Sequence, residues 1–112
     1  MLLTIETKIN ITEEDIECII EMAGYGIGYW CSEAAEREDG YDVYDVEEEK
    51  WYYLDYEDIL EGIKMYIENG NHPYSIVNND DLLGCSIASE NIDAEVADMI
   101  IQYCCFGQII YA

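Results

Sequence analysis

The residues whose types and spacing suggest chemistry are carboxylates, and they are densest in one stretch of the chain. This stretch contains Asp39, Asp42, Asp45, Glu47, Glu48, Glu49, Asp55, Glu57, Asp58 and Glu61. Carboxylates held on a rigid hairpin and at the start of a helix present negative charges at spacings comparable to those of phosphates. Two hypotheses follow. The stretch imitates nucleic acid toward a basic protein groove, or it is a solvated face that only keeps the protein soluble.

Aromatic residues are interleaved with these acids. On a strand, Asp42 and Tyr44 share one face, whereas Tyr41, Val43 and Asp45 share the other. About half of the aromatic rings must fill the core; the rest suit a basic partner, because Arg can stack on a ring and pair with a neighbouring carboxylate. The residues expected to bind a partner are Asp42, Tyr44, Asp45, Glu47, Glu48, Glu49, Tyr52, Asp55, Glu57, Asp58 and Glu61.

The net charge limits the class of partner. The 112 residues include 26 acidic and four basic side chains, which gives a formal charge of −22 at pH 7. Affinity for DNA, RNA and anionic lipid comes from neutralising phosphates with Lys and Arg, so direct binding to these polymers is not expected. The charge favours a cationic partner, which could be a protein with a basic surface, a metal ion or a cationic small molecule. The hypothesis of nucleic-acid mimicry selects the basic surface of a nucleic-acid-binding protein or nuclease complex.

Other constellations do not point to catalysis. His72 is the only histidine, and the cysteines (Cys18, Cys31, Cys85, Cys104, Cys105) form no CxxC pair and are odd in number, which favours free, packed thiols in a reducing cytosol. The GYGIGYW segment follows a helix, so it predicts a turn and not a dinucleotide site. Asn78–Asp81 lacks the order of a calcium loop. We therefore expect no enzyme activity, no cofactor and no metal.

Hydrophobic periodicity and turn residues predict the elements that would position these side chains. The expected strands are Leu2–Thr7, one entered through Gly28–Trp30, the hairpin Tyr41–Val46 with Lys50–Leu54, a short piece at Cys85–Ala88, and Gln108–Tyr111. The expected helices are capped by Thr12, Asp55 and Asp93 and end at Gly24 with Gly26, at Asn69–Gly70 and at Gly107. Asn71–Leu83 is expected to be a long loop.

These elements predict one domain over residues 1–112 of the α+β class. We expect a mainly antiparallel sheet of three to four strands with three helices packed on it. The last strand, Gln108–Tyr111, leaves two alternatives, since it can close the protein's own sheet or pair across a homodimer. The N-terminus shows no signal-peptide pattern, and no apolar run approaches the roughly 18 residues that span a bilayer. The expected location is therefore the cytoplasm.

The C-terminal run Asp93–Tyr111 (DAEVADMIIQYCCFGQIIY) resembles the ending of small acidic proteins encoded by phages and prophages. Gly28–Trp30 and the segment DYEDILEGIKMYIENG (Asp55–Gly70) are also similar to that group. The resemblance covers about half of the chain and carries no catalytic motif. It implies a phage origin and expression in the cytoplasm of a bacterial host. It also favours a protein that blocks a host system.

The leading hypothesis is a phage counter-defence inhibitor, similar in charge to anti-CRISPR proteins and restriction inhibitors that mimic DNA. Its acidic face would block a basic nucleic-acid-binding channel. One alternative is a counter-defence protein that sequesters a nucleotide, although only four basic side chains are available for phosphates. The other alternative is an acidic interaction module of phage transcription or replication machinery.

Overall fold

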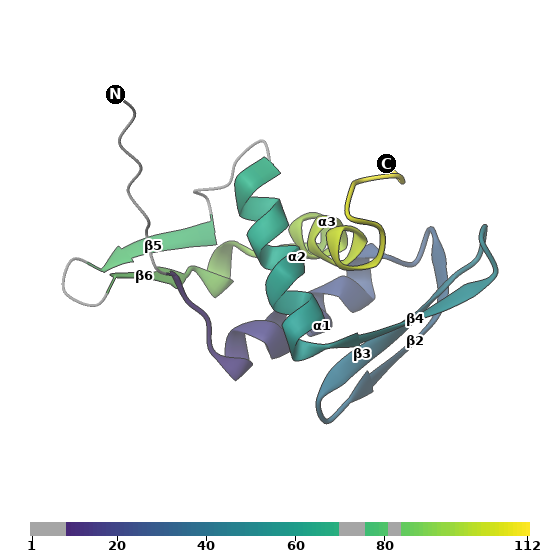
Figure 1. Cartoon of the computed structure of the whole chain (residues 1–112), viewed down its shortest axis with the longest axis horizontal. Helices are drawn as coiled ribbons and strands as arrows, with labels where there is room; N and C mark the ends of the chain where they lie inside the picture. The colour runs from purple at the N-terminus through teal and green to yellow at the C-terminus, as the bar shows by residue number, and fades with distance from the viewer. Residues whose placement is uncertain (1–8, 70–75, 81–83) are drawn as a thin grey trace.

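The computed structural model describes residues 9–69, 76–80 and 84–112. Its elements are β1 (Ile9–Asn10), α1 (Glu13–Gly26), β2 (Cys31–Arg37), β3 (Gly40–Asp45), β4 (Lys50–Asp55), α2 (Tyr56–Asn69), β5 (Val77–Asp80), β6 (Gly84–Ile87), the 3-10 turn η2 (Ser89–Asn91) and α3 (Ala94–Phe106) (Figure 1). The predicted α+β class is confirmed. The strand predicted at Leu2–Thr7 lies outside the described residues.

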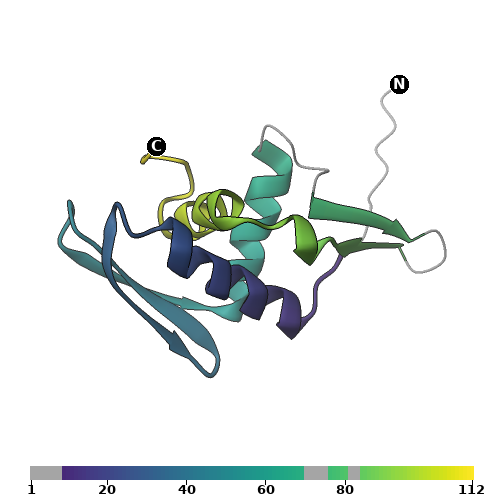
Figure 2. The ribbon, with the colours of Figure 1, turned by 180° about the vertical axis from the view of Figure 1, so that it is seen from behind.

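The strands form two sheets and not the single sheet that the sequence suggested. β2, β3 and β4 make an antiparallel sheet in sequence order, whereas β6 pairs with β1 in parallel and with β5 in antiparallel orientation. The helices lie between the two sheets in both ribbon views (Figures 1 and 2). The first strand pairs with β6, so the larger sheet has three strands.

Local chemistry explains where the helices begin. Thr12 caps α1, and its hydroxyl accepts from the Asp15 N–H at 3.2 Å while the Asp15 carboxylate accepts from the Thr12 N–H at 2.9 Å. Asp55 and Asp58 exchange the same pair of bonds at the start of α2. Asp93 accepts from the Val96 N–H at 2.8 Å at the start of α3. All three predicted caps are therefore confirmed, because caps depend on residues three positions apart.

The core lies where α2 and α3 cross. Ile59 and Ile63 of α2 and Ile100 and Ile101 of α3 are completely buried. The two helices approach closely at Gly62, where an added Cβ atom would lie 2.1 Å from the Cys104 sulfur and 2.9 Å from the Ile100 carbonyl oxygen. The glycine is thus required by the packing of the two helices and not by its backbone angles.

Two sequence predictions fail outside the large sheet. The loop expected at Asn71–Leu83 contains β5, whose Asn-rich sequence has low strand propensity but pairs with β6 over Val77–Asp80. Gln108–Tyr111 is not a strand, since the side chain of Gln102 bonds its backbone in place of a strand partner. In the part of the chain that the structure describes, no helix is long and apolar enough to cross a membrane.

The close crossing at Gly62 makes a prediction for stability. Gly62→Ala should lower the free energy of unfolding by about 1–3 kcal/mol, because the methyl group forces α2 and α3 apart. The matched control is Gly24→Ala in α1, where nothing lies within 4 Å of the added Cβ. This control should be neutral or stabilising by up to about 1 kcal/mol. Urea unfolding of both variants measures the difference, and equal midpoints would contradict the packing argument.

Candidate acidic interface

The solvent face of the large sheet carries a row of aromatic rings. Tyr44 of β3 lies opposite Trp51 of β4, and Asp42 lies opposite Tyr53. The ring centroids of Tyr44 and Trp51 are 5.4 Å apart, and those of Trp51 and Tyr53 are 6.2 Å apart and nearly parallel. Tyr53 is 67% exposed. Sequence reasoning left Trp51 and Tyr53 out of the site, although strand alternation places them on the face of Asp42 and Tyr44.

Exposed acids gather at both ends of β4, and not in one continuous patch. At one end, the turn between β3 and β4 contributes Glu47, Glu48 and Glu49, which are all exposed. At the other end, the start of α2 contributes Asp55, Glu57, Asp58 and Glu61, which are also exposed. A six-residue strand separates the two groups by roughly 17 Å. We call the two groups and the aromatic row (Tyr44, Trp51, Tyr53) the acidic hairpin surface.

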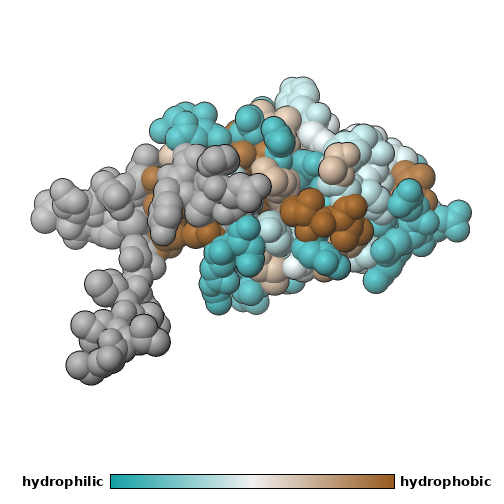
Figure 3. Space-filling model, turned by 90° about the horizontal axis from the view of Figure 1, so that it is seen from above, coloured by the Kyte–Doolittle hydropathy of each residue, from teal (hydrophilic) through white to brown (hydrophobic). Residues whose placement is uncertain are grey.

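The space-filling view is consistent with this placement. Hydrophilic residues project at the right-hand end of Figure 3, which is the end formed by the β2–β3–β4 sheet in Figure 1. Hydrophilic residues therefore project from this end, beside the paler and more hydrophobic residues that Figure 3 also shows there.

Some of the predicted acids already have partners. Asp42 accepts from Arg37 Nε at 2.8 Å, and Asp39 accepts from Arg37 Nη1 at 3.1 Å. Asp55 and Asp58 cap α2, and Glu48 accepts from the Tyr52 hydroxyl at 2.9 Å. Glu47, Glu49, Glu57 and Glu61 form no ion pair with any lysine or arginine in the described ranges. Those four carboxylates are the acids of the predicted set that remain available to a partner.

Glu49 holds a strained backbone conformation. Its φ angle is +53°, in the left-handed region that glycine and asparagine usually occupy. The turn Val46–Glu49 joins Asp45 to Lys50, which face each other across the hairpin. A left-handed conformation costs roughly 1–2 kcal/mol for a residue with a Cβ atom. An acid therefore stands where the turn would favour glycine.

Two predicted partner-binding residues face inward instead. Asp45 is 0% exposed and accepts from the Tyr111 hydroxyl at 2.8 Å and from the Glu47 N–H at 3.1 Å. Tyr52 is half-buried, and its ring packs edge-on against Phe106. The prediction that Asp45 contacts a partner is wrong for this structure, because its strand face points into the core. Of the Tyr52 side chain, only the hydroxyl reaches the acidic turn (Glu47, Glu48, Glu49), where it donates to Glu48.

A second buried carboxylate lies on α3. Asp98 is 7% exposed and accepts from Trp30 Nε1 at 2.7 Å, from the Tyr29 hydroxyl at 2.5 Å and from Gln102 Nε2 at 3.0 Å. No described lysine or arginine forms an ion pair with it. The sequence did carry a signal for this residue, since Asp98 falls three residues before Ile101 on the apolar side of the helix.

Gln102 and Tyr111 attach the C-terminal segment to this centre. The Gln102 carbonyl oxygen accepts from the N–H groups of Ile110 and Tyr111 at 3.0 and 2.9 Å, and its amide donates to the Tyr111 carbonyl at 3.1 Å. The Tyr111 ring stacks on Trp30 with an interplanar angle of 10°. The segment is thus tied to both buried carboxylates, to Asp45 by its phenol and to Asp98 through Gln102.

Burial keeps the tyrosines and thiols of this region protonated. Burial and the hydrogen bond to Asp98 raise the pKa of Tyr29 to about 12. Burial and the bond to Asp45 raise the pKa of Tyr111 well above its usual value. Burial raises the pKa of the Cys104 thiol to about 12. A thiolate nucleophile is therefore disfavoured at Cys104.

Comparisons with known proteins add no relative. No protein-family model, no curated protein and no solved structure matches the chain. Among the described residues, no three His, Cys, Asp or Glu side chains are grouped so that they could hold a metal ion. The observations that bear on function are therefore the acidic hairpin surface and the two buried carboxylates.

The Tyr111–Asp45 bond makes a prediction for stability. Tyr111→Phe should lower the free energy of unfolding by about 2–3 kcal/mol, because it removes a donor from a fully buried carboxylate. Tyr53→Phe is the control, since Tyr53 is exposed; it should change stability by less than about 0.5 kcal/mol. Urea denaturation followed by circular dichroism measures both. Two indistinguishable midpoints would show that the phenol does not hold Asp45.

The raised tyrosine pKa predicts loss of stability in alkali. Unfolded Tyr29 loses its proton near its ordinary pKa of 10, whereas the native residue keeps its proton until about pH 12. The unfolded state therefore binds fewer protons between these values, and the free energy of unfolding falls as pH rises from about 10 to 12. Urea midpoints should fall over this range, and less steeply in Tyr29→Phe. An unchanged slope in the variant would exclude Tyr29 as a source.

Proposed function

We propose that this protein inhibits a nucleic-acid-binding protein by occupying its basic surface with the acidic hairpin surface. The observation that carries the proposal is the pair of exposed acid groups at the two ends of β4, with Glu47, Glu49, Glu57 and Glu61 unpaired by described cations. The resemblance to acidic phage proteins suggests that the partner belongs to a bacterial defence system. Inhibition is then competitive with DNA or RNA.

The spacing of the two acid groups supports a nucleic-acid decoy. They are separated by roughly 17 Å along β4, and phosphates along one DNA strand advance by about 3.4 Å each. The distance therefore corresponds to about five phosphates. A channel that holds a short stretch of backbone through Lys and Arg can contact both groups at once.

The aromatic row fits the same partner. Tyr44, Trp51 and Tyr53 are in contact on the solvent face between the two acid groups. Arginine stacks on such rings while its guanidinium pairs with carboxylates. The chain itself contains a related contact, since Lys50 Nζ lies 4.7 Å from the centre of the Tyr52 ring. A partner surface rich in Arg gains from both the rings and the acids.

The size of the charge favours this function over solubility alone. A net charge of about 2 to 8 in magnitude suffices to keep a small domain soluble, whereas this chain carries −22. Self-repulsion from the excess destabilises the compact state. A binding role gives the excess charge a use, because long-range attraction to a basic partner accelerates association.

Charge reversal of the acidic turn tests the proposal. The wild-type chain is first immobilised and used to capture partners from a bacterial lysate at low and high salt. Each captured partner is then purified in complex with the nucleic acid that it binds. The wild-type chain should displace that nucleic acid, and displacement should weaken as salt rises. Glu47→Lys, Glu48→Lys and Glu49→Lys together should weaken it by about tenfold or more, since close charge pairs across interfaces contribute about 1.5 kcal/mol or more.

The matched control places the same charge change on α1. Glu14→Lys, Glu17→Lys and Glu21→Lys alter three exposed acids of that helix and leave the acidic hairpin surface intact. This triple variant should displace nucleic acid nearly as well as the wild type. Equal losses in both triple variants would mean that only net charge matters. Capture of proteins that bind no nucleic acid would contradict the decoy function.

A further inference from the structure

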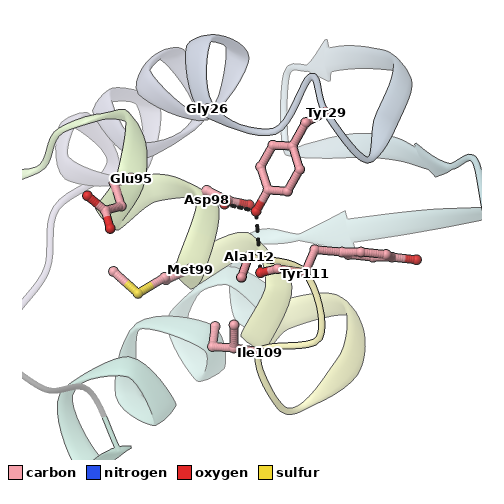
Figure 4. Close-up of a pocket in the computed structure, with 8 residues that line it drawn as sticks. All are labelled: Gly26, Tyr29, Glu95, Asp98, Met99, Ile109, Tyr111 and Ala112. Carbon is pink, nitrogen blue, oxygen red and sulfur yellow. Dashed lines mark hydrogen bonds between the residues drawn. The ribbon is translucent and has the colours of Figure 1, made fainter.

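A pocket beside Asp98 is separate from the acidic hairpin surface. It has a volume of about 490 Å³ and lies between the end of α1, the first turns of α3 and the C-terminal segment (Figure 4). Its lining residues are Gly26, Tyr29, Glu95, Asp98, Met99, Ile109, Tyr111 and Ala112. Pockets that bind small molecules usually measure about 300–1,000 Å³, so this pocket has the size for a small ligand.

The charge of the pocket is negative. Glu95 and Asp98 contribute carboxylates, and neither lysine nor arginine is present in the lining. Asp98 is more than nine-tenths buried, and its three hydrogen-bond donors, Trp30, Tyr29 and Gln102, are all neutral. A buried charge that lacks a counter-ion is costly even when it is hydrogen-bonded. A cation in the pocket would supply the missing counter-charge.

Asp98 also retains room for one more donor. A carboxylate has about four acceptor positions. Of the donors in the part of the chain that the structure describes, two reach Oδ1 of Asp98 and one reaches Oδ2, which leaves one acceptor position on Oδ2. The Tyr29 hydroxyl bonded to Oδ2 lies in the same wall, as Figure 4 shows. The unfilled position is therefore on the oxygen that also accepts from the Tyr29 hydroxyl.

The remaining wall selects the kind of cation. Met99 and Ile109 make much of the lining apolar, which suits a hydrocarbon body. The two carboxylates are fewer than the six to eight oxygen ligands that calcium takes. A guanidinium group is planar, presents five N–H donors and is more weakly hydrated than an ammonium group. Its donors suit the two carboxylates of the lining, buried Asp98 and exposed Glu95.

We propose that this pocket binds a guanidinium group carried on a short aliphatic chain, either a free small molecule or an arginine side chain of another protein. Asp98 and Glu95 neutralise the charge, and Met99 and Ile109 contact the chain. The proposal does not depend on the decoy function, because none of the residues lining the pocket belongs to the acidic hairpin surface.

Titration with a charged and a neutral ligand of the same shape tests the proposal. n-Butylguanidinium and n-butylurea are added separately to the ¹⁵N-labelled protein at about 0.15 M salt, where surface attraction is screened. The charged ligand should bind about tenfold more tightly, because both ligands donate N–H groups but only the guanidinium carries a positive charge that pairs with the two carboxylates. The indole N–H signal of Trp30, which bonds Asp98, should shift, whereas that of Trp51 should not. Equal affinities, or an unchanged Trp30 signal, would overturn the proposal.

Two variants distinguish binding in the pocket from nonspecific electrostatic attraction to the negatively charged protein. Glu95→Gln removes the exposed rim charge and should weaken n-butylguanidinium binding by about threefold to fivefold. Glu36→Gln makes the same charge change on β2, outside the pocket, and should leave affinity unchanged. Equal affinities of the two variants would refute the site. A blocked Gly-Arg-Gly peptide then identifies the source: binding as tight as n-butylguanidinium supports a protein side chain, and weaker binding supports a free small molecule.

Discussion

Two buried carboxylates that pair with no described lysine or arginine impose the constraint on which the structure depends. With only four basic residues in the chain, Asp45 and Asp98 are held by neutral donors: two phenols, an indole, an amide and a backbone N–H. Those donors come from the turn before β2, from the turn between β3 and β4, from α3 and from the C-terminal segment. Satisfying the two charges therefore joins the large sheet, the helices and the end of the chain, since an unpaired buried carboxylate would be costly.

Features that depend on neighbouring residues could be predicted from the sequence, whereas features that depend on these long-range contacts could not. Helix caps at Thr12, Asp55 and Asp93 were predictable because they depend on residues three positions apart. The hairpin was predictable from alternating aromatic residues. The burial of Asp45 was not, because alternation shows which residues share a face but does not show which face meets the core. The position of the C-terminal segment could not be predicted either. Its backbone N–H groups bond the side-chain amide of Gln102 on α3 and not the backbone of a neighbouring strand.

The two acidic residue types have different roles in this chain. Each Asp side chain described by the structure makes a hydrogen bond: Asp15, Asp55, Asp58 and Asp93 cap helices, Asp39 and Asp42 bind Arg37, and Asp45 and Asp98 are buried. Among the glutamates described, only Glu48 accepts a side-chain hydrogen bond. A short side chain reaches nearby backbone groups, whereas a longer one extends into solvent. The aspartates therefore build the fold, and the glutamates supply most of the charge open to a partner.

The backbone conformation of Glu49 bears on the function of the exposed glutamates. A glycine at the same position would avoid the left-handed strain and would leave the hairpin register unchanged. Glutamate instead adds a third charge to the turn, beside Glu47 and Glu48, at a cost in backbone strain and in mutual repulsion. Solubility does not require that charge, since many other exposed acids already provide it. The proposed function accounts for this strain, because a partner that contacts the turn would respond to the position of a single charge.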